Sequence, residues 1–169
     1  NCPTLEHVIS IGPGMPEGFK DVQEGIANAA PFVKPVHPNT NDDIMMMYFT
    51  SGTTGEPKMV AHDFTYPLGH LTTGAFWHNL HENSLHLTIA DTGWGKAAWG
   101  KLYGQWLCEG AVFVYDFDRF DAEKILPMFA KYQITTFCAP PTMLRMFIKQ
   151  DLSHYDLSSI QHMSTAGEA

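Results

Sequence analysis

Apolar and polar residues alternate along the chain in a way that predicts strands, each followed by a helix. Apolar runs at residues 85–90, 111–115 and 135–139 have the length and composition of β-strands, and a shorter run falls within residues 157–165. Between them, apolar residues recur every three or four positions, as in amphipathic helices. Strands that alternate with helices over short connections indicate a parallel sheet. The pattern therefore predicts an α/β fold with a mainly parallel sheet flanked by helices.

The predicted helices differ in how regular their spacing is. Residues 99–107 carry apolar side chains at positions i, i+3, i+4, i+7 and i+8, which makes this the cleanest amphipathic helix in the chain. Residues 63–81 follow a weaker helical pattern, with two glycines that allow close approach of another backbone. Asp121 is placed to cap a third helix, in which Pro127 predicts a kink or a late start. The proline pair at 140–141 predicts the beginning of a fourth.

The first 43 residues predict one strand–helix unit. A β-prone run at residues 7–12 ends in a Gly-Pro-Gly turn signal. Residues 19–29 then have the apolar spacing of an amphipathic helix, which Pro31 ends. Residues 34–43 are rich in proline, asparagine and threonine, and we expect a loop there.

A glycine-rich stretch between two apolar runs predicts a β-hairpin whose turn binds phosphate. We expect a buried strand at residues 45–49 and its return strand at 59–61, antiparallel to each other. Glycines permit close approach of the backbone, and hydroxyls, N–H groups and a lysine then face one small volume, which suits an anion. Composition alone fits an exposed turn equally well, but the Pro57-Lys58 pair favours phosphate. The residues of this predicted phosphate loop are Thr50, Ser51, Gly52, Thr53, Thr54, Gly55 and Lys58.

The loop does not have the spacing of an ordinary P-loop NTPase. That motif requires four residues between its first glycine and a Gly-Lys-Ser/Thr triplet. Here Gly52 and Gly55 are two residues apart, and Lys58 lies between a proline and Met59. ATP hydrolysis by a P-loop motor is therefore disfavoured.

Three motifs, in order along most of the chain, resemble the acyl-adenylate-forming superfamily. Residues 50–58 (Thr-Ser-Gly-Thr-Thr-Gly-Glu-Pro-Lys) look like its phosphate-loop signature, although the family usually has glycine where this chain has Met59. The Asp-Thr-Gly-Trp sequence at 91–94, together with the lysine, methionine and histidine of residues 58–62, is similar to the medium-chain acyl-CoA synthetase branch. Residues 166–169 look like the Gly-Glu segment that contacts adenine.

This resemblance implies a function and a set of binding residues. The enzymes of this family activate a carboxylic acid, such as a fatty acid, with ATP to an acyl-adenylate and transfer the acyl group to coenzyme A. It implies that the phosphate loop holds the β- and γ-phosphates and that Thr50 helps to coordinate Mg²⁺. It further implies that Trp94 and Gly95 border the acyl pocket; without the resemblance Trp94 would be interpreted as a core tryptophan. The residues implied to lie against adenine and ribose are Gly167, Glu168 and Ala169.

Several parts of the family pattern do not occur in the chain. The downstream Tyr-Gly-x-Thr-Glu segment, the ribose aspartate, the hinge and the C-terminal lysine are missing from residues 1–169. We therefore expect this chain to be a fragment of the family's large N-terminal domain, without the C-terminal domain and inactive as a synthetase by itself. The resemblance assigns no catalytic residue within it. The alternative is a non-catalytic nucleotide-binding or structural module that keeps a glycine-rich turn.

Charge and cysteine content limit the partners and the compartment. The chain has 10 basic and 18 acidic side chains and a formal net charge of −8, which argues against nucleic acid as a partner. Three widely spaced cysteines suit free thiols in a reducing compartment. No signal segment and no apolar run that approaches the length of a membrane span occur, so we expect a cytoplasmic protein without a span. Nothing in the pattern indicates an oligomeric state.

Nine histidines raise the question of a metal site. His78, His81 and His86 lie close in sequence, but no cysteine or third ligand stands at a fixed spacing from them. We expect a surface cluster rather than a zinc site. His62 follows the hairpin, where capping or packing is favoured over chemistry.

Overall fold

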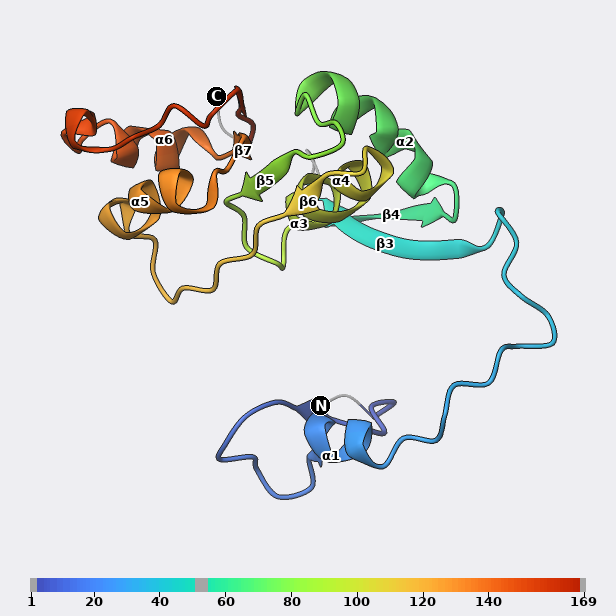
Figure 1. Ribbon diagram of the computed structural model, residues 1–169. Helices are drawn as coiled ribbons and strands as arrows, with labels where there is room; N and C mark the ends of the chain where they lie inside the picture. Colours follow the sequence, from blue (N-terminus) through green and yellow to red (C-terminus); the bar gives the residue numbers. More distant parts are fainter. Residues whose placement is uncertain (1–2, 51–54, 168–169) are drawn as a thin grey trace. The chain divides into compact units, whose positions relative to one another are not determined.

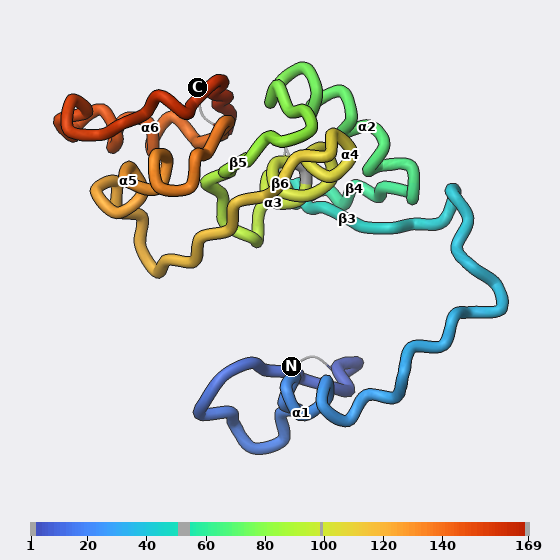
Figure 2. Tube along the Cα trace, in the orientation of Figure 1, coloured from blue at the N-terminus to red at the C-terminus, as the bar shows by residue number. Residues whose placement is uncertain are grey.

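The computed structural model describes residues 3–50 and 55–167, apart from the side chain at position 99 (Figures 1 and 2). The chain forms two compact units, residues 1–39 and residues 40–169. No helix in the described part of the chain combines the length and the apolar character that crossing a lipid bilayer requires.

The smaller unit contains two short parallel strands and one helix. Strands β1 (Ile9–Ser10) and β2 (Lys20–Asp21) pair in parallel, and α1 (Val22–Ala27) follows directly. Asp21 begins the helix, because its side chain accepts a hydrogen bond from the N–H of Gln23 at 2.7 Å. The predicted strand and helix are both present but shorter than expected. No residue of α1 is buried, so the unit lacks the packing that would extend its elements.

The larger unit begins with the predicted antiparallel hairpin. Strand β3 (Ile44–Thr50) pairs with β4 (Lys58–Asp63), and Thr50 stands opposite Lys58 at the turn end. The expectation that the first strand is buried is wrong: Phe49 is 72% exposed, and Met47 is also exposed. A hairpin of two strands has neighbours on one face only, so its alternate side chains face outward.

A four-stranded parallel sheet forms the centre of this unit and confirms the predicted α/β class. The strand order is β6 (Ala111–Val112), β5 (Leu85–Thr88), β7 (Thr136–Cys138) and β8 (His162–Ser164), and every neighbouring pair is parallel. These strands are shorter than the apolar runs that predicted them.

One face of the sheet carries the hydrophobic core. Leu87 of β5 and Phe137 of β7 point toward helices α5 (Ala122–Tyr132) and α6 (Pro141–Phe147), which lie beside β7 in Figure 1. The predicted cap is confirmed, because Asp121 accepts a hydrogen bond from the N–H of Glu123 at 3.1 Å. The helix begins at its cap and contains its proline, so the alternative of a late start does not occur. The side chains of this core are those of Leu87, Ile89, Ala122, Ile125, Leu126, Phe129, Ile134, Phe137, Ala139 and Phe147.

The opposite face of the sheet is polar, yet it is also buried. His86 and Thr88 of β5 and Thr136 of β7 alternate with the core residues and therefore point the other way. Three consecutive helical segments adjoin this face: α3 (Gly95–Ala98), the π-helix η2 (Trp99–Tyr103) and α4 (Gly104–Leu107). The Thr88 hydroxyl donates a hydrogen bond to the carbonyl of Gly100, which joins the strand to η2.

The predicted apolar stripe of residues 99–107 is not the buried face of this helical run. Trp106 is 64% exposed, whereas Gly100, Gly104 and Gln105 are buried. The reason is that small residues let the run approach the sheet and a neighbouring helix closely. That neighbour is α2 (Tyr66–Thr72) continued by the π-helix η1 (Thr73–Trp77), and Figure 1 shows α2 and α4 near each other.

Gly74 of η1 is expected to be the position in this helix pair least tolerant of a side chain. A Cβ added there would lie 2.7 Å from the carbonyl oxygen of Gly104, which is a backbone atom and cannot rotate away. Gly74→Ala should therefore lower the free energy of unfolding by about 1–3 kcal/mol, as overpacking does. Equilibrium urea denaturation measures this change. Gly69→Ala is the matched control, because its Cβ would meet nothing within 4 Å and alanine favours helix. Equal stability of Gly74→Ala and the wild type would contradict the close contact.

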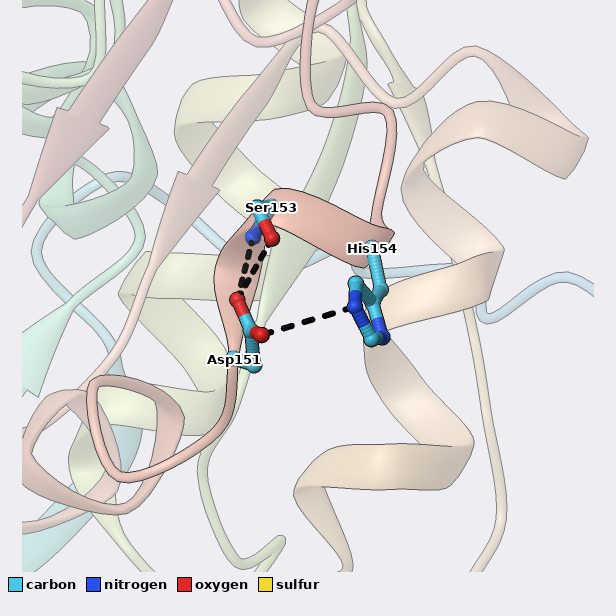
Figure 3. Close-up of polar contacts among 3 residues, drawn as sticks. All are labelled: Asp151, Ser153 and His154. Carbon is cyan, nitrogen blue, oxygen red and sulfur yellow. Dashed lines mark hydrogen bonds and ion pairs between the residues drawn. The ribbon is translucent and has the colours of Figure 1, made fainter.

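A capped turn leads from α6 to the last strand (Figure 3). Asp151 accepts hydrogen bonds from the N–H of Ser153 at 3.1 Å and from its hydroxyl at 2.6 Å, and so begins the short helix η3 (Leu152–His154). These bonds hold the pKa of Asp151 below its ordinary value. His154 Nε2 lies 3.4 Å from the same carboxylate, in an exposed pair that contributes little to stability.

Candidate functional site

The turn end of the hairpin presents Thr50 and Lys58, the first and last residues of the predicted phosphate loop. Thr50 is the last residue of β3, Lys58 is the first of β4, and both are exposed. Gly55 has φ +119°, in the region that favours glycine, as expected for a backbone that turns tightly. Residues 51–54, which carry the other predicted phosphate contacts, lie outside the described residues.

Tyr48 brings the hairpin against the segment predicted to border the acyl pocket. A Cβ built on Gly95 would lie 3.6 Å from the Tyr48 ring, so the hairpin and the start of α3 are in contact. Side chains alternate along a strand, so Thr50 lies on the same face of β3 as Tyr48. Strand β3, which ends at Thr50, and the Trp94-Gly95 segment lie far apart in the sequence and are thereby brought together.

Tyr48, which makes the contact with Gly95, also belongs to a row of aromatic rings. Tyr48, His62 and Tyr66 form a cluster in which the last two ring centroids are 4.4 Å apart. The row continues through His70, whose ring stacks on Tyr103. Burial raises the pKa of Tyr66 and lowers the pKa of His70, so both are neutral near pH 7. The rings come from β3, β4, α2 and η2 and pack against one another, which accords with the packing role expected for His62.

Trp94 lines a cavity beyond the carboxyl ends of β5 and β7. The cavity has a volume of about 410 Å³, and its wall includes Ile89, Phe113, Tyr115 and Pro140. Trp94 itself is 59% exposed, so its interpretation as a core tryptophan is wrong. Open α/β sheets place their ligands at this end of the strands.

Lys101 also faces this cavity and was not indicated by the sequence motifs. Its Nζ donates a hydrogen bond to the carbonyl of Ala90 at 2.8 Å. Burial lowers the pKa of Lys101, and the nearby Asp91 carboxylate opposes this shift. The cavity therefore has mostly apolar walls, with charged side chains from Asp91, Lys101, Asp116 and Asp118.

Lys96 connects the Trp94-Gly95 segment to the motif at the end of the chain. Its side chain is buried, and its Nζ donates a hydrogen bond to the carbonyl of Ala166 at 3.0 Å. The next residue, Gly167, has φ +107°, which favours glycine. Glu168 and Ala169 lie outside the described residues. The sequence carried no signal for this contact, because a lysine in a short glycine- and alanine-rich helix is expected to face solvent.

The expected surface cluster of histidines is wrong for two of its three members. His78 and His86 are fully buried, with ring centroids 4.7 Å apart, whereas His81 is exposed. They are buried because His86 lies on the polar face of the sheet and His78, at the end of η1, packs against it, and hydroxyl groups form hydrogen bonds with both rings. His78 Nδ1 lies 2.9 Å from Ser164 Oγ, and His86 Nδ1 lies 2.7 Å from Thr136 Oγ1. Within residues 3–50 and 55–167, no three His, Cys, Asp or Glu side chains are grouped to hold a metal ion.

The fold of the chain is similar to that of solved CoA ligases. The crystal structure of the anthranilate CoA ligase AuaEII in complex with anthranoyl-AMP matches with a TM-score of 0.81 and 28% sequence identity, over 99% of this chain and 32% of that chain. The crystal structure of Brucella canis acyl-CoA synthetase matches with a TM-score of 0.75 and 25% identity, over 93% of this chain and 29% of that chain.

The chain belongs to the AMP-binding enzyme family, whose model matches residues 3–169. It is 36% identical over 168 residues to the human acyl-coenzyme A synthetase ACSM4, mitochondrial, which covers 99% of this chain and 29% of the relative. It is also 36% identical over 170 residues to the mouse ACSM5, mitochondrial, covering 100% of this chain and 29% of the relative. The predicted resemblance is thus confirmed. The chain spans less than a third of either relative, and both are named as mitochondrial, so a cytoplasmic location stays a prediction.

Proposed function

We propose that the intact protein is an AMP-forming acid–CoA ligase. A carboxylate oxygen of the substrate attacks the α-phosphorus of ATP, pyrophosphate leaves, and an acyl-adenylate forms. The thiolate of coenzyme A then attacks the acyl carbonyl carbon, and AMP leaves. The observation that supports this proposal is the junction of three motifs: the hairpin end meets Gly95 through Tyr48, and Lys96 joins the same helix to Ala166.

The hairpin end would serve the triphosphate. Pyrophosphate is a good leaving group only when its charge is stabilised, and donors held in place by a rigid hairpin do this with little loss of entropy. Thr50, the loop residues 51–54, Gly55 and Lys58 would hold the β- and γ-phosphates. A Mg²⁺ ion is usually bound by phosphates and waters with one or two protein oxygens. The exposed hydroxyl of Thr50 suits that role, and we propose it as the protein ligand.

The start of α3 and the cavity would serve the acid. A cavity of about 410 Å³ lies in the size range of small-molecule sites, and its aromatic walls suit an apolar acyl group. Trp94 and Gly95 would border that group. Gly167, with Glu168 and Ala169, would lie against the adenine and ribose.

Pyrophosphate release from the intact protein tests the function. With ATP and Mg²⁺ we expect release that depends on a carboxylic acid, measured over a panel of butyrate, octanoate and anthranilate. Lys58→Ala should raise the KM for ATP by about tenfold or more, because it removes a charge-assisted hydrogen bond to phosphate. Lys131→Ala is the matched control, because Lys131 is an exposed lysine near the end of α5 that belongs neither to the predicted phosphate loop nor to the cavity wall.

The alternative module gives a different result in the same assay. A protein that binds ATP but releases no pyrophosphate with any acid would be a non-catalytic nucleotide-binding module. A protein whose ATP affinity is unchanged by Lys58→Ala would contradict the assignment of the phosphate loop.

A further inference from the structure

Lys96 is unusual among the lysines of this chain, because it is the one whose side chain is buried, with 6% of its surface exposed. It lies in α3, directly after Gly95, and reaches across to the polar face of the sheet. Its Nζ donates to the Ala166 carbonyl at 3.0 Å, and the amine also interacts with the thiol of Cys138. The two ends of this contact are 70 residues apart in the chain.

Among the residues that the structure describes, the groups around Lys96 supply no negative charge. Within the described residues, no carboxylate lies at ion-pair distance from its amine. The groups that face it are the neutral Ser164 and Cys138, together with His78, whose pKa is lowered to about 4 by burial first and then by His162 and Lys96 itself. Burying an ammonium without an anion is unfavourable, and an apolar side chain would fill the same space at lower cost. Packing alone therefore does not explain a lysine here.

The contact fixes the peptide that precedes the predicted nucleotide-binding residues. Ala166 is held from one side by Lys96, and the neighbouring Thr165 hydroxyl donates to the Ala139 carbonyl at 2.8 Å. Gly167 follows with φ +107°. The orientation of the peptide before it therefore sets the direction of the chain at Gly167. A displaced Ala166 carbonyl would move Gly167.

We propose that Lys96 is a positioning residue for the nucleotide: its amine holds the Ala166 carbonyl and thereby sets where the segment beginning at Gly167 meets ATP. Because Lys96 follows Gly95 directly, the same bond joins the acid side of the site to the nucleotide side. The assignment rests on the proposed function for the identity of the nucleotide site. It adds a residue that does not belong to the predicted phosphate loop.

Lys96→Met tests the assignment in the intact protein, because methionine keeps the volume and loses the donor. We expect the KM for ATP in pyrophosphate release and the Kd for ATP in calorimetry both to rise about tenfold or more, with a smaller change in kcat. Lys96→Arg keeps the charge and a donor and should restore ATP affinity to within about threefold of the wild type. Lys101→Met removes a similar bond, to Ala90 on the cavity side, and should change the KM for the acid but not for ATP. If Lys96→Met fails to fold, Lys96→Gln carries the same test, because it is neutral and too short to reach Ala166.

The two binding readouts separate this inference from the proposed function. A merely structural role would lower the active fraction, and hence kcat, without changing the KM or the Kd for ATP; that result would overturn the inference. ATP binding that Lys96→Met weakens, in a protein that adenylates no acid, would support the positioning role and reject the ligase. Unchanged ATP affinity in an active ligase would reject the positioning role alone.

Discussion

Replacing Phe129 with alanine is expected to lower the free energy of unfolding by about 3–5 kcal/mol, as large truncations in a packed core do. Phe129 is 1% exposed and lies on α5 at the centre of the core. Its ring packs edge-on against Phe137 of β7 at 5.1 Å and against Phe147 of α6 at 6.4 Å. Alanine would leave a cavity where α5, α6 and β7 meet, because the ring of Phe129 contacts both Phe137 and Phe147. Urea denaturation followed by circular dichroism gives the change in the free energy of unfolding.

Phe76→Ala is the matched control for this truncation. Phe76 carries the same side chain but is 83% exposed, so its loss removes little buried area. We expect a change within about 0.5 kcal/mol for this surface position. A loss of less than about 1 kcal/mol for Phe129→Ala would mean that α5 does not pack on the sheet as described. Strands β5 and β7 carry the core on one face and the polar residues next to Lys96 on the other. A stable core therefore also holds these polar residues in place.

The parts of the fold that follow from local rules were predictable from the sequence. The parallel sheet follows from apolar runs that alternate with helical spacing, and the hairpin follows from two runs around a glycine-rich turn. The helix cap at Asp121 needs only one acidic side chain before an apolar stripe. Each of these signals lies within a few residues of the structure that it predicts.

The parts that depend on tertiary packing were not predictable. The stripe of residues 99–107 fits an amphipathic helix, but packing through Gly100 and Gly104 turns the opposite face inward. Spacing reports which side chains share a face, not which face meets a partner. The same limit explains the histidine error: only the register of β5 beside β7 shows that His86 has a hydroxyl partner and can be buried.

In the candidate site, too, the residues of short motifs were predictable and those defined by distant contacts were not. Thr50, Lys58, Trp94, Gly95 and Gly167 were found from short motifs, and the structure brings the hairpin end, the start of α3 and the last motif together. Lys96 and Lys101 were missed, because each is defined by a bond to a distant backbone carbonyl, which leaves no mark in the local sequence.

Lowering the pH from 7.5 to 5.0 is expected to destabilise the protein through His78 and His86. Burial lowers the pKa of His78 to about 4 and that of His86 to about 3, while both titrate near 6.5 in the unfolded chain. Above pH 6.5 neither state binds a proton at these rings, so their contribution is fully present. Below it the unfolded state binds protons and the folded state does not, and stability falls by about 1.4 kcal/mol per pH unit for each ring. At pH 5.0 the loss is about 2 kcal/mol for each histidine, or about 4 kcal/mol together.

His86→Gln separates this effect from the general titration of the protein. A glutamine amide can still bond to the hydroxyls of Thr136 and Thr88, which lie 2.7 and 2.8 Å from the two ring nitrogens of His86, but it binds no proton. We expect the loss of stability between pH 7.5 and 5.0, measured by urea denaturation at each pH, to be about half that of the wild type. His81→Gln, at an exposed histidine, should leave the full loss in place. An identical pH dependence in His86→Gln and the wild type would show that His86 takes up its proton in the folded state. In that case the polar face of the sheet would be open to water rather than sealed beneath α3, η2 and α4.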